Sequence, residues 1–129
     1  MKTRAQQIMS DKDARTPQEV TQCIHDIAAE FEPYIIRQRR HFHKYPEPSL
    51  AEVRTTSDIA NQLDAMNIPY ERPLKTGLVA TLRGTAPDAY REDGTPRRRI
   101  LLRADIDALP VTEQTGEEFA STNEGFMHA

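Results

Sequence analysis

The sequence feature that most constrains the fold is residues 100–110, which read Ile-Leu-Leu-Arg-Ala-Asp-Ile-Asp-Ala-Leu-Pro. The apolar start is typical of a buried β-strand, and Asp105 and Asp107 follow just before Pro110. Alternate side chains of a strand share a face, so we expect both carboxylates on one side. Open α/β sheets bind ligands at the carboxyl ends of their strands. The alternative is that both aspartates merely cap the following turn, where Asp is common.

Size and composition favour one small soluble domain. The chain has 129 residues and a formal net charge of −3, which gives no support for nucleic acid or a membrane surface as a partner. The single cysteine, Cys23, excludes an internal disulfide and fits a reducing compartment. The start lacks the apolar core of a signal peptide, and no stretch has the length to span a bilayer. We therefore expect a cytoplasmic protein.

An amphipathic helix is predicted to follow a polar start. Residues 1–16 carry alternating charges and are predicted to be a disordered lead-in, so that one partial catalytic domain occupies residues 17–129. Thr16 and Glu19 have the spacing of a capping box, in which each side chain accepts from the other's backbone amide. Apolar residues then recur every three or four positions. Pro33 predicts a kink or a restart of this helix.

A second helix and two extended segments are predicted before the central run. The helix is predicted to open with a capping box at Ser49 and to end at Asn67, a residue that tolerates a left-handed backbone. Residues 68–72 are predicted to be extended, residues 76–84 to form a strand and residues 85–97 a long exposed loop. Two helices cannot cover both faces of such a sheet, so the sequence indicates the amino-terminal part of a larger α/β domain.

Residues 37–45 are basic, with aromatic side chains between the cations. This composition is found in nucleic-acid-binding patches. The favoured interpretation is a solvated helix face whose cations complement the helix dipole near its carboxyl end. No second basic patch is phased with this one, so we predict no nucleic-acid partner.

Six segments, in order and with natural spacing, together carry a resemblance to a known family. They are Arg-Arg-His-Phe-His-Lys-Tyr-Pro-Glu at 39–47, Glu52 with Thr55, Thr56 and Ile59, Thr-Gly-Leu-Val-Ala-Thr-Leu at 76–82, Arg-Ala-Asp-Ile-Asp-Ala-Leu-Pro at 103–110, Thr-Gly-Glu-Glu-Phe-Ala-Ser at 115–121 and Met-His-Ala at 127–129. From about residue 36 to the end, the chain resembles the aminoacylase, hippurate hydrolase and auxin-conjugate amidohydrolase group. This group belongs to the di-metal zinc-exopeptidase superfamily.

The resemblance implies a fold, an activity and a cofactor. The fold is the amino-terminal portion of a zinc-exopeptidase-like catalytic domain, with helices on a mixed sheet, incomplete in this chain. The activity is hydrolysis of N-acyl amino acids, peptides or related small amides by two divalent metal ions, Zn, Mn or Co. In the family, Cys-Gly-His-Asp with two metal ligands follows Met-His-Ala, where this sequence stops. We therefore expect no metal in this fragment and no activity from it. The family's separate small domain usually governs dimerisation, so a homodimer is expected of the full-length protein.

The resemblance also assigns roles to individual residues. Asp107 matches the aspartate that orients a metal-binding histidine from behind, and it is the first catalytic candidate. Asp105 stands where the wider superfamily has that histidine, and it is the second candidate. No residue is assigned as a metal ligand. His43 is expected to pack or form hydrogen bonds, and His128 to shape its loop. His25 and His41 are expected to face solvent.

Two classes of function remain open. One is an enzyme of which the sequence holds only the first part. The other is a genuinely short, non-catalytic protein that binds a partner through its uncovered sheet.

Overall fold

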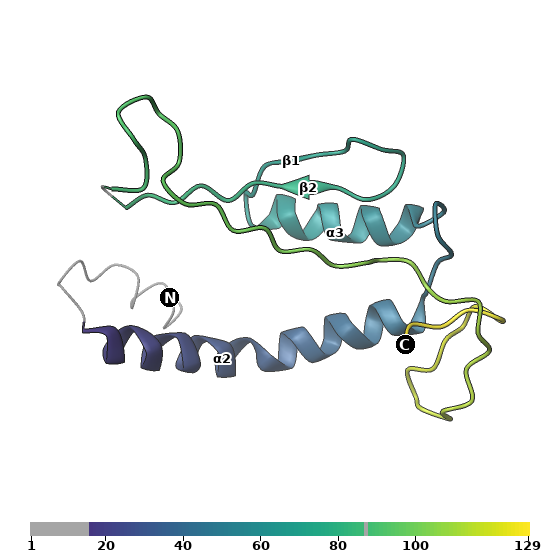
Figure 1. The fold of residues 1–129 in the computed structure, drawn as a ribbon. Helices are drawn as coiled ribbons and strands as arrows, with labels where there is room; N and C mark the ends of the chain where they lie inside the picture. The colour runs from purple at the N-terminus through teal and green to yellow at the C-terminus, as the bar shows by residue number, and fades with distance from the viewer. Residues whose placement is uncertain (1–15, 87) are drawn as a thin grey trace. The chain divides into compact units, whose positions relative to one another are not determined.

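A computed structural model of the chain describes residues 16–86 and 88–129 (Figure 1). The helices are α2, Pro17–Lys44, and α3, Val53–Ala65; the strands are β1, Tyr70–Glu71, and β2, Val79–Ala80. These elements confirm the predicted α/β class. The chain divides into two compact units, of which the first ends at His41 and the second is Phe42–Ala129. The predicted disordered lead-in, apart from Thr16, lies outside the described residues.

Helix α2 begins as the sequence predicts. The Thr16 amide and hydroxyl donate to Glu19 Oε2 at 2.7 and 2.9 Å, and the Glu19 amide donates to Thr16 Oγ1 at 3.3 Å. The predicted restart at Pro33 is wrong, because α2 continues through this residue to Lys44. A proline removes one backbone donor, and a long helix with favourable residues on both sides tolerates that loss. No helix in the described part of the chain is long and apolar enough to cross a membrane.

The predicted capping box at Ser49 does not form. Leu50 has a φ of 65° and the Ala51 amide donates to the Pro48 carbonyl at 3.1 Å, so a turn occupies these residues and α3 starts only at Val53. The Glu52 side chain makes no capping bond either. The far end of α3 is as predicted, since Asn67 has a left-handed φ of 55°.

The cap of α3 comes instead from Glu47, which precedes the turn. Its Oε2 accepts the Thr55 amide at 2.7 Å and the Thr55 hydroxyl at 2.8 Å, and its Oε1 accepts the Arg54 amide at 3.1 Å. These amides belong to the first turn of α3, where backbone donors have no partner within the helix. Burial opposes ionisation of Glu47, but the bonds from Thr55 and Arg54 outweigh it and hold its pKa below the ordinary value. Glu47 is therefore a remote N-cap.

Strands β1 and β2 form a short antiparallel hairpin beside α3. Tyr70 pairs with Ala80 and Glu71 with Val79, so the strand predicted over residues 76–84 is reduced to two residues. The predicted extended segment at 68–72 is confirmed by β1 at its centre. The Gly77 amide donates at 2.8 Å to Oγ1 of Thr56, which is buried in α3, and so ties the hairpin to the helix.

The buried strand predicted at the start of residues 100–110 is wrong. Residues 98–107 form no helix or strand, and Figure 1 draws them as a bare extended line. The side chains of Ile100, Leu101 and Leu102 are 86 to 91% exposed. A strand forms only where a neighbouring backbone supplies hydrogen bonds, and in the described part of the chain the hairpin strands pair only with each other. Residues 100–102 therefore have the composition of a buried strand, but no neighbouring strand in the described part of the chain pairs with them.

Three chain segments meet in a junction at the buried Ala108 in the Phe42–Ala129 unit. The amide of the buried Ala108 donates to the Glu47 carbonyl at 2.9 Å, in a parallel bridge between Pro48 and Ala108. The next residue, Leu109, exchanges backbone bonds with Met127 at 2.9 and 3.1 Å. Residues 108–109 are therefore held between the segment after α2 and the end of the described chain.

Replacing Glu47 by Ala should lower the free energy of unfolding by about 1 to 2 kcal/mol, since it leaves two amides of the first turn of α3 without their acceptor. Urea unfolding followed by circular dichroism measures this change. Ser49→Ala is the matched control, because Ser49 is exposed and outside the observed cap. Equal losses in the two variants would contradict the remote cap.

Candidate functional site

The two aspartates of the central run lie in different environments. The Asp105 side chain is 67% exposed and accepts a 2.5 Å bond from Nη2 of Arg103, itself 78% exposed. Such an exposed ion pair contributes little to stability. Asp107 is half-buried and directly precedes the buried Ala108. Of the two candidates, Asp107 is therefore the one fixed by the junction, and Asp105 lies on the open surface.

His128 is electrostatically coupled to Asp107. Burial holds the pKa of His128 below its ordinary value, the electrostatic effect of His43 lowers it further, and the Asp107 carboxylate acts in the opposite direction. Asp107 lies two residues before Leu109 and His128 directly follows Met127, so the backbone pair between Leu109 and Met127 brings their two segments together. A neutral imidazole next to a carboxylate can accept a proton or offer a lone pair. This pairing of Asp107 with His128 is the candidate site.

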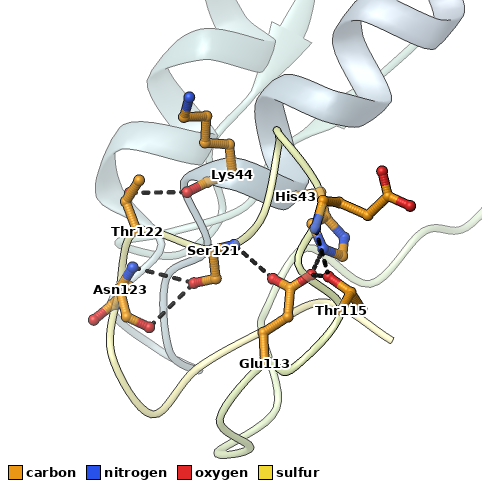
Figure 2. A network of polar contacts seen from close by, with 8 residues as sticks. His43, Lys44, Glu113, Thr115, Ser121, Thr122 and Asn123 are labelled. Carbon is orange, nitrogen blue, oxygen red and sulfur yellow. Dashed lines mark hydrogen bonds and ion pairs between the residues drawn. The ribbon is translucent and has the colours of Figure 1, made fainter.

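A buried carboxylate, Glu113, fixes the segment that follows the candidate site (Figure 2). Its side chain is 4% exposed and lies 2.9 Å from Nε2 of His43, at the end of α2. The Thr115 hydroxyl donates to Oε1 and the Ser121 amide to Oε2, each at 2.5 Å. The Thr115 hydroxyl, then His43, then the Ser121 amide lower the pKa of Glu113 to about 2. Glu113 is thus ionised at neutral pH and holds both ends of the 113–121 loop.

A second set of bonds attaches this loop to the carboxyl end of α2. The Thr122 amide and hydroxyl both donate to the Lys44 carbonyl at 2.9 Å, which satisfies an acceptor of the last helical turn. The Asn123 side-chain amide donates to the Pro46 carbonyl at 3.1 Å. Figure 2 shows the bond between Thr122 and Lys44 at the end of the helix. Both attachments fix the path of the chain shortly before Met127 and His128.

The histidine predictions can be compared with these contacts. His43 makes the hydrogen bond and packing contact expected of it, since its ring also lies edge-to-face on Phe119 with centroids 5.5 Å apart. His25 and His41 are exposed, as predicted. The sequence reasoning missed Glu113, whose partner His43 lies 70 positions away. No local spacing could indicate that pair.

The metal-ligating residue types do not gather within the described part of the chain. No group of three or more His, Cys, Asp or Glu side chains there could hold a metal ion. The candidate pair of Asp107 and His128 is therefore not by itself a metal centre.

Comparison with known proteins gives relatives far longer than this chain. No profile of a known family matches it. An uncharacterized hydrolase of Staphylococcus epidermidis is 44% identical over 96 residues, which are 74% of this chain and 22% of the relative. An uncharacterized hydrolase of Staphylococcus saprophyticus is 42% identical over 96 residues, with the same shares. The chain thus spans about a fifth of these relatives.

Two solved structures share the fold. One is a Bacillus subtilis protein described as a dinuclear metal binding peptidase from the M20 family, with a TM-score of 0.65 and 39% identity over 78% of this chain and 26% of that protein. The other is a proposed aminohydrolase from methicillin-resistant Staphylococcus aureus, with a TM-score of 0.66 and 34% identity over 81% of this chain and 26% of that protein.

The fold and the similarity define a segment of an α/β peptidase-type catalytic domain. The chain is similar to a peptidase of the M20 family and covers about a quarter of that protein's length. The predicted resemblance is thereby confirmed.

The ionised Glu113 should make the stability of the chain depend on pH. Its folded pKa of about 2 lies below the ordinary 4.5, so its contribution is complete above the ordinary value and is lost as the pH falls towards 2. Glu113→Gln should flatten this acid loss, measured by urea unfolding at successive pH values. The exposed Glu124→Gln is the control and should leave the pH profile unchanged. Identical profiles of wild type and Glu113→Gln would contradict the assignment.

Proposed function

We propose that this chain is the amino-terminal part of a metal-dependent hydrolase that cleaves the amide bond of N-acyl amino acids, peptides or related small amides. The observation that carries the proposal is the likeness in fold and sequence to a dinuclear metal binding peptidase, at 39% identity and a TM-score of 0.65. The relatives are about three times as long as this chain, so this activity would belong to a family-length protein. The 129-residue chain alone would be inactive.

Two divalent metal ions, Zn, Mn or Co, would polarise the amide carbonyl and lower the pKa of a bound water in such an enzyme. Because the described residues contain no ligand cluster, we assign no metal ligand and no catalytic step to them. We propose that these residues hold the chain around Asp107 and His128 in place. The backbone bonds of Ala108 and Leu109 would fix the chain next to Asp107, and the bonds of Glu113 would fix the 113–121 loop that precedes His128.

The remaining predictions about partners and compartment extend this proposal. Substrate is a small molecule or peptide, with neither nucleic acid nor membrane as a partner. The family-length protein would be cytoplasmic and a homodimer. A non-catalytic binding role is the second candidate, and the exposed apolar residues 100–102 are the observation that favours it.

The 129-residue chain should not bind zinc tightly in a 1:1 ratio, because zinc sites need three or four convergent ligands. Equilibrium dialysis followed by elemental analysis measures the bound metal. Retention of stoichiometric zinc against a chelator would show that the chain holds a metal centre of its own.

A chimera tests the enzymatic proposal. Residues 16–129 would replace the matching segment of the Bacillus subtilis peptidase, and hydrolysis of N-acetyl amino acids and dipeptides would be measured with metal content. We expect activity and two bound metals. Asp107→Ala should lower activity or metal affinity about 10- to 100-fold, with a larger effect on kcat than on KM, because this carboxylate positions other groups.

Asp88→Ala provides the control for the chimera, since it removes an exposed aspartate from the 85–97 loop. It should leave both kinetic constants within a few-fold of the parent. A folded, metal-loaded chimera that hydrolyses no amide would refute the proposed function. Full activity of Asp107→Ala with its metals in place would refute only the role of Asp107.

A further inference from the structure

Glu113 connects three segments of the Phe42–Ala129 unit at one buried carboxylate (Figure 2). Its side chain is 4% exposed, and its two oxygens bond to different segments. Oε1 lies 2.9 Å from Nε2 of His43 and accepts the Thr115 hydroxyl, while Oε2 accepts the Ser121 amide. Because all these contacts lie within the chain, the donor and the acceptor of each bond can be assigned.

The bonds of Glu113 determine which nitrogen of His43 carries the hydrogen. The Thr115 hydroxyl and the other donors lower the pKa of Glu113 to about 2, so at neutral pH its carboxylate is ionised and only accepts hydrogen bonds. The hydrogen between Oε1 and the imidazole therefore belongs to Nε2. A neutral imidazole has one donor and one acceptor nitrogen, so Nδ1 carries the lone pair.

The His43 ring is held in place and acts on the candidate site. Phe119 packs edge-to-face against it, with ring centroids 5.5 Å apart, which restricts rotation of the imidazole. His43 also has an electrostatic effect on His128, opposite in direction to that of Asp107. The dipole of a neutral imidazole depends on its tautomer, because the N–H side of the ring is positive and the lone-pair side is negative.

We propose that Glu113 and His43 are positioning residues of the candidate site, in which the carboxylate keeps the imidazole hydrogen on Nε2 and so sets the ring dipole that acts on His128. This inference rests on the proposed hydrolysis and adds a condition to it, namely that the site needs one tautomer of His43. Neither residue has to contact substrate in this role. A carboxylate that orients an imidazole fixes its tautomer, and the wrong tautomer lowers the rate of a reaction.

Replacing Glu113 by Gln should reverse the bond to His43 while keeping the size of the side chain. The Ser121 backbone amide is a donor only, so the oxygen of the new amide has to face Ser121. Its NH2 group then takes the place of Oε1 and donates to Nε2 of His43. Because Nε2 becomes an acceptor, the imidazole hydrogen moves to Nδ1. The Thr115 hydroxyl can rotate and accept from the same NH2 group.

Nitrogen NMR of the 129-residue chain with isotope-labelled histidine measures this tautomer. At a pH where the ring is neutral, wild type should carry the hydrogen on Nε2 of His43, and Glu113→Gln should carry it on Nδ1. The His43 signals are assigned by their loss in His43→Gln. The exposed Glu124→Gln is the matched control and should leave the tautomer unchanged. The same His43 tautomer in wild type and Glu113→Gln would overturn the proposal.

Kinetics of the chimera of residues 16–129 with the Bacillus subtilis peptidase measure the effect on the site. Glu113→Gln should lower kcat about tenfold and leave KM within about twofold, because the pair positions other groups and does not bind substrate. His43→Gln, whose amide can still donate to Glu113, should lower kcat by a similar factor. The double variant should be no slower than the slower single variant, since both changes break one interaction.

The outcomes separate this inference from the proposed function. A folded, metal-loaded chimera that hydrolyses no amide would refute the proposed function and the positioning role with it. An active chimera whose kcat is unchanged by Glu113→Gln, or whose two losses multiply in the double variant, would overturn the positioning role alone. Circular dichroism verifies that each variant keeps its helices.

Discussion

The described fold after α2 depends on one residue, Glu47, which uses both its side chain and its backbone. Its carboxylate accepts two amides of the first turn of α3, and its carbonyl accepts the amide of Ala108. Buried backbone groups must find partners, so both attachments are strongly favoured once the segment is enclosed. Because Pro46 and Pro48 flank Glu47, the backbone on either side has little freedom to place it differently. The start of a helix and the position of Asp107 are thereby set together.

The second fixed point, Glu113, acts on the opposite side of the candidate site. Its carboxylate binds His43 at the end of α2 and closes the 113–121 loop through Thr115 and Ser121. Burial lowers the pKa of His128, His43 lowers it further by its electrostatic effect, and Asp107 raises it. The pKa of His128 therefore depends on its burial and on two side chains that come from separate segments of the chain. A change in the loop can alter the chemistry of the site without touching Asp107.

Whether the sequence could predict an interaction depends on how far apart its partners lie along the chain. The Thr16 and Glu19 cap and the left-handed Asn67 depend on neighbours a few residues away, and local spacing predicted both. The cap at Ser49 failed because a turn at Leu50 competes with it and Glu47 supplies the acceptors. The Glu113 bond to His43 could not be predicted, since nothing local marks it. Asp105 and Asp107 were found from their pattern, but the pattern could not show that only Asp107 is held by the junction.

The exposed residues 100–102 show where the pattern and the structure diverge most. Apolar residues in a row predict a buried strand only if other strands are present to bury it, and burial is a property of the neighbours as much as of the run. Proteins usually protect an open strand with charge, and this segment is well supplied with charge. Here arginines precede the apolar run and aspartates follow it, so charged side chains stand at both ends of the exposed backbone.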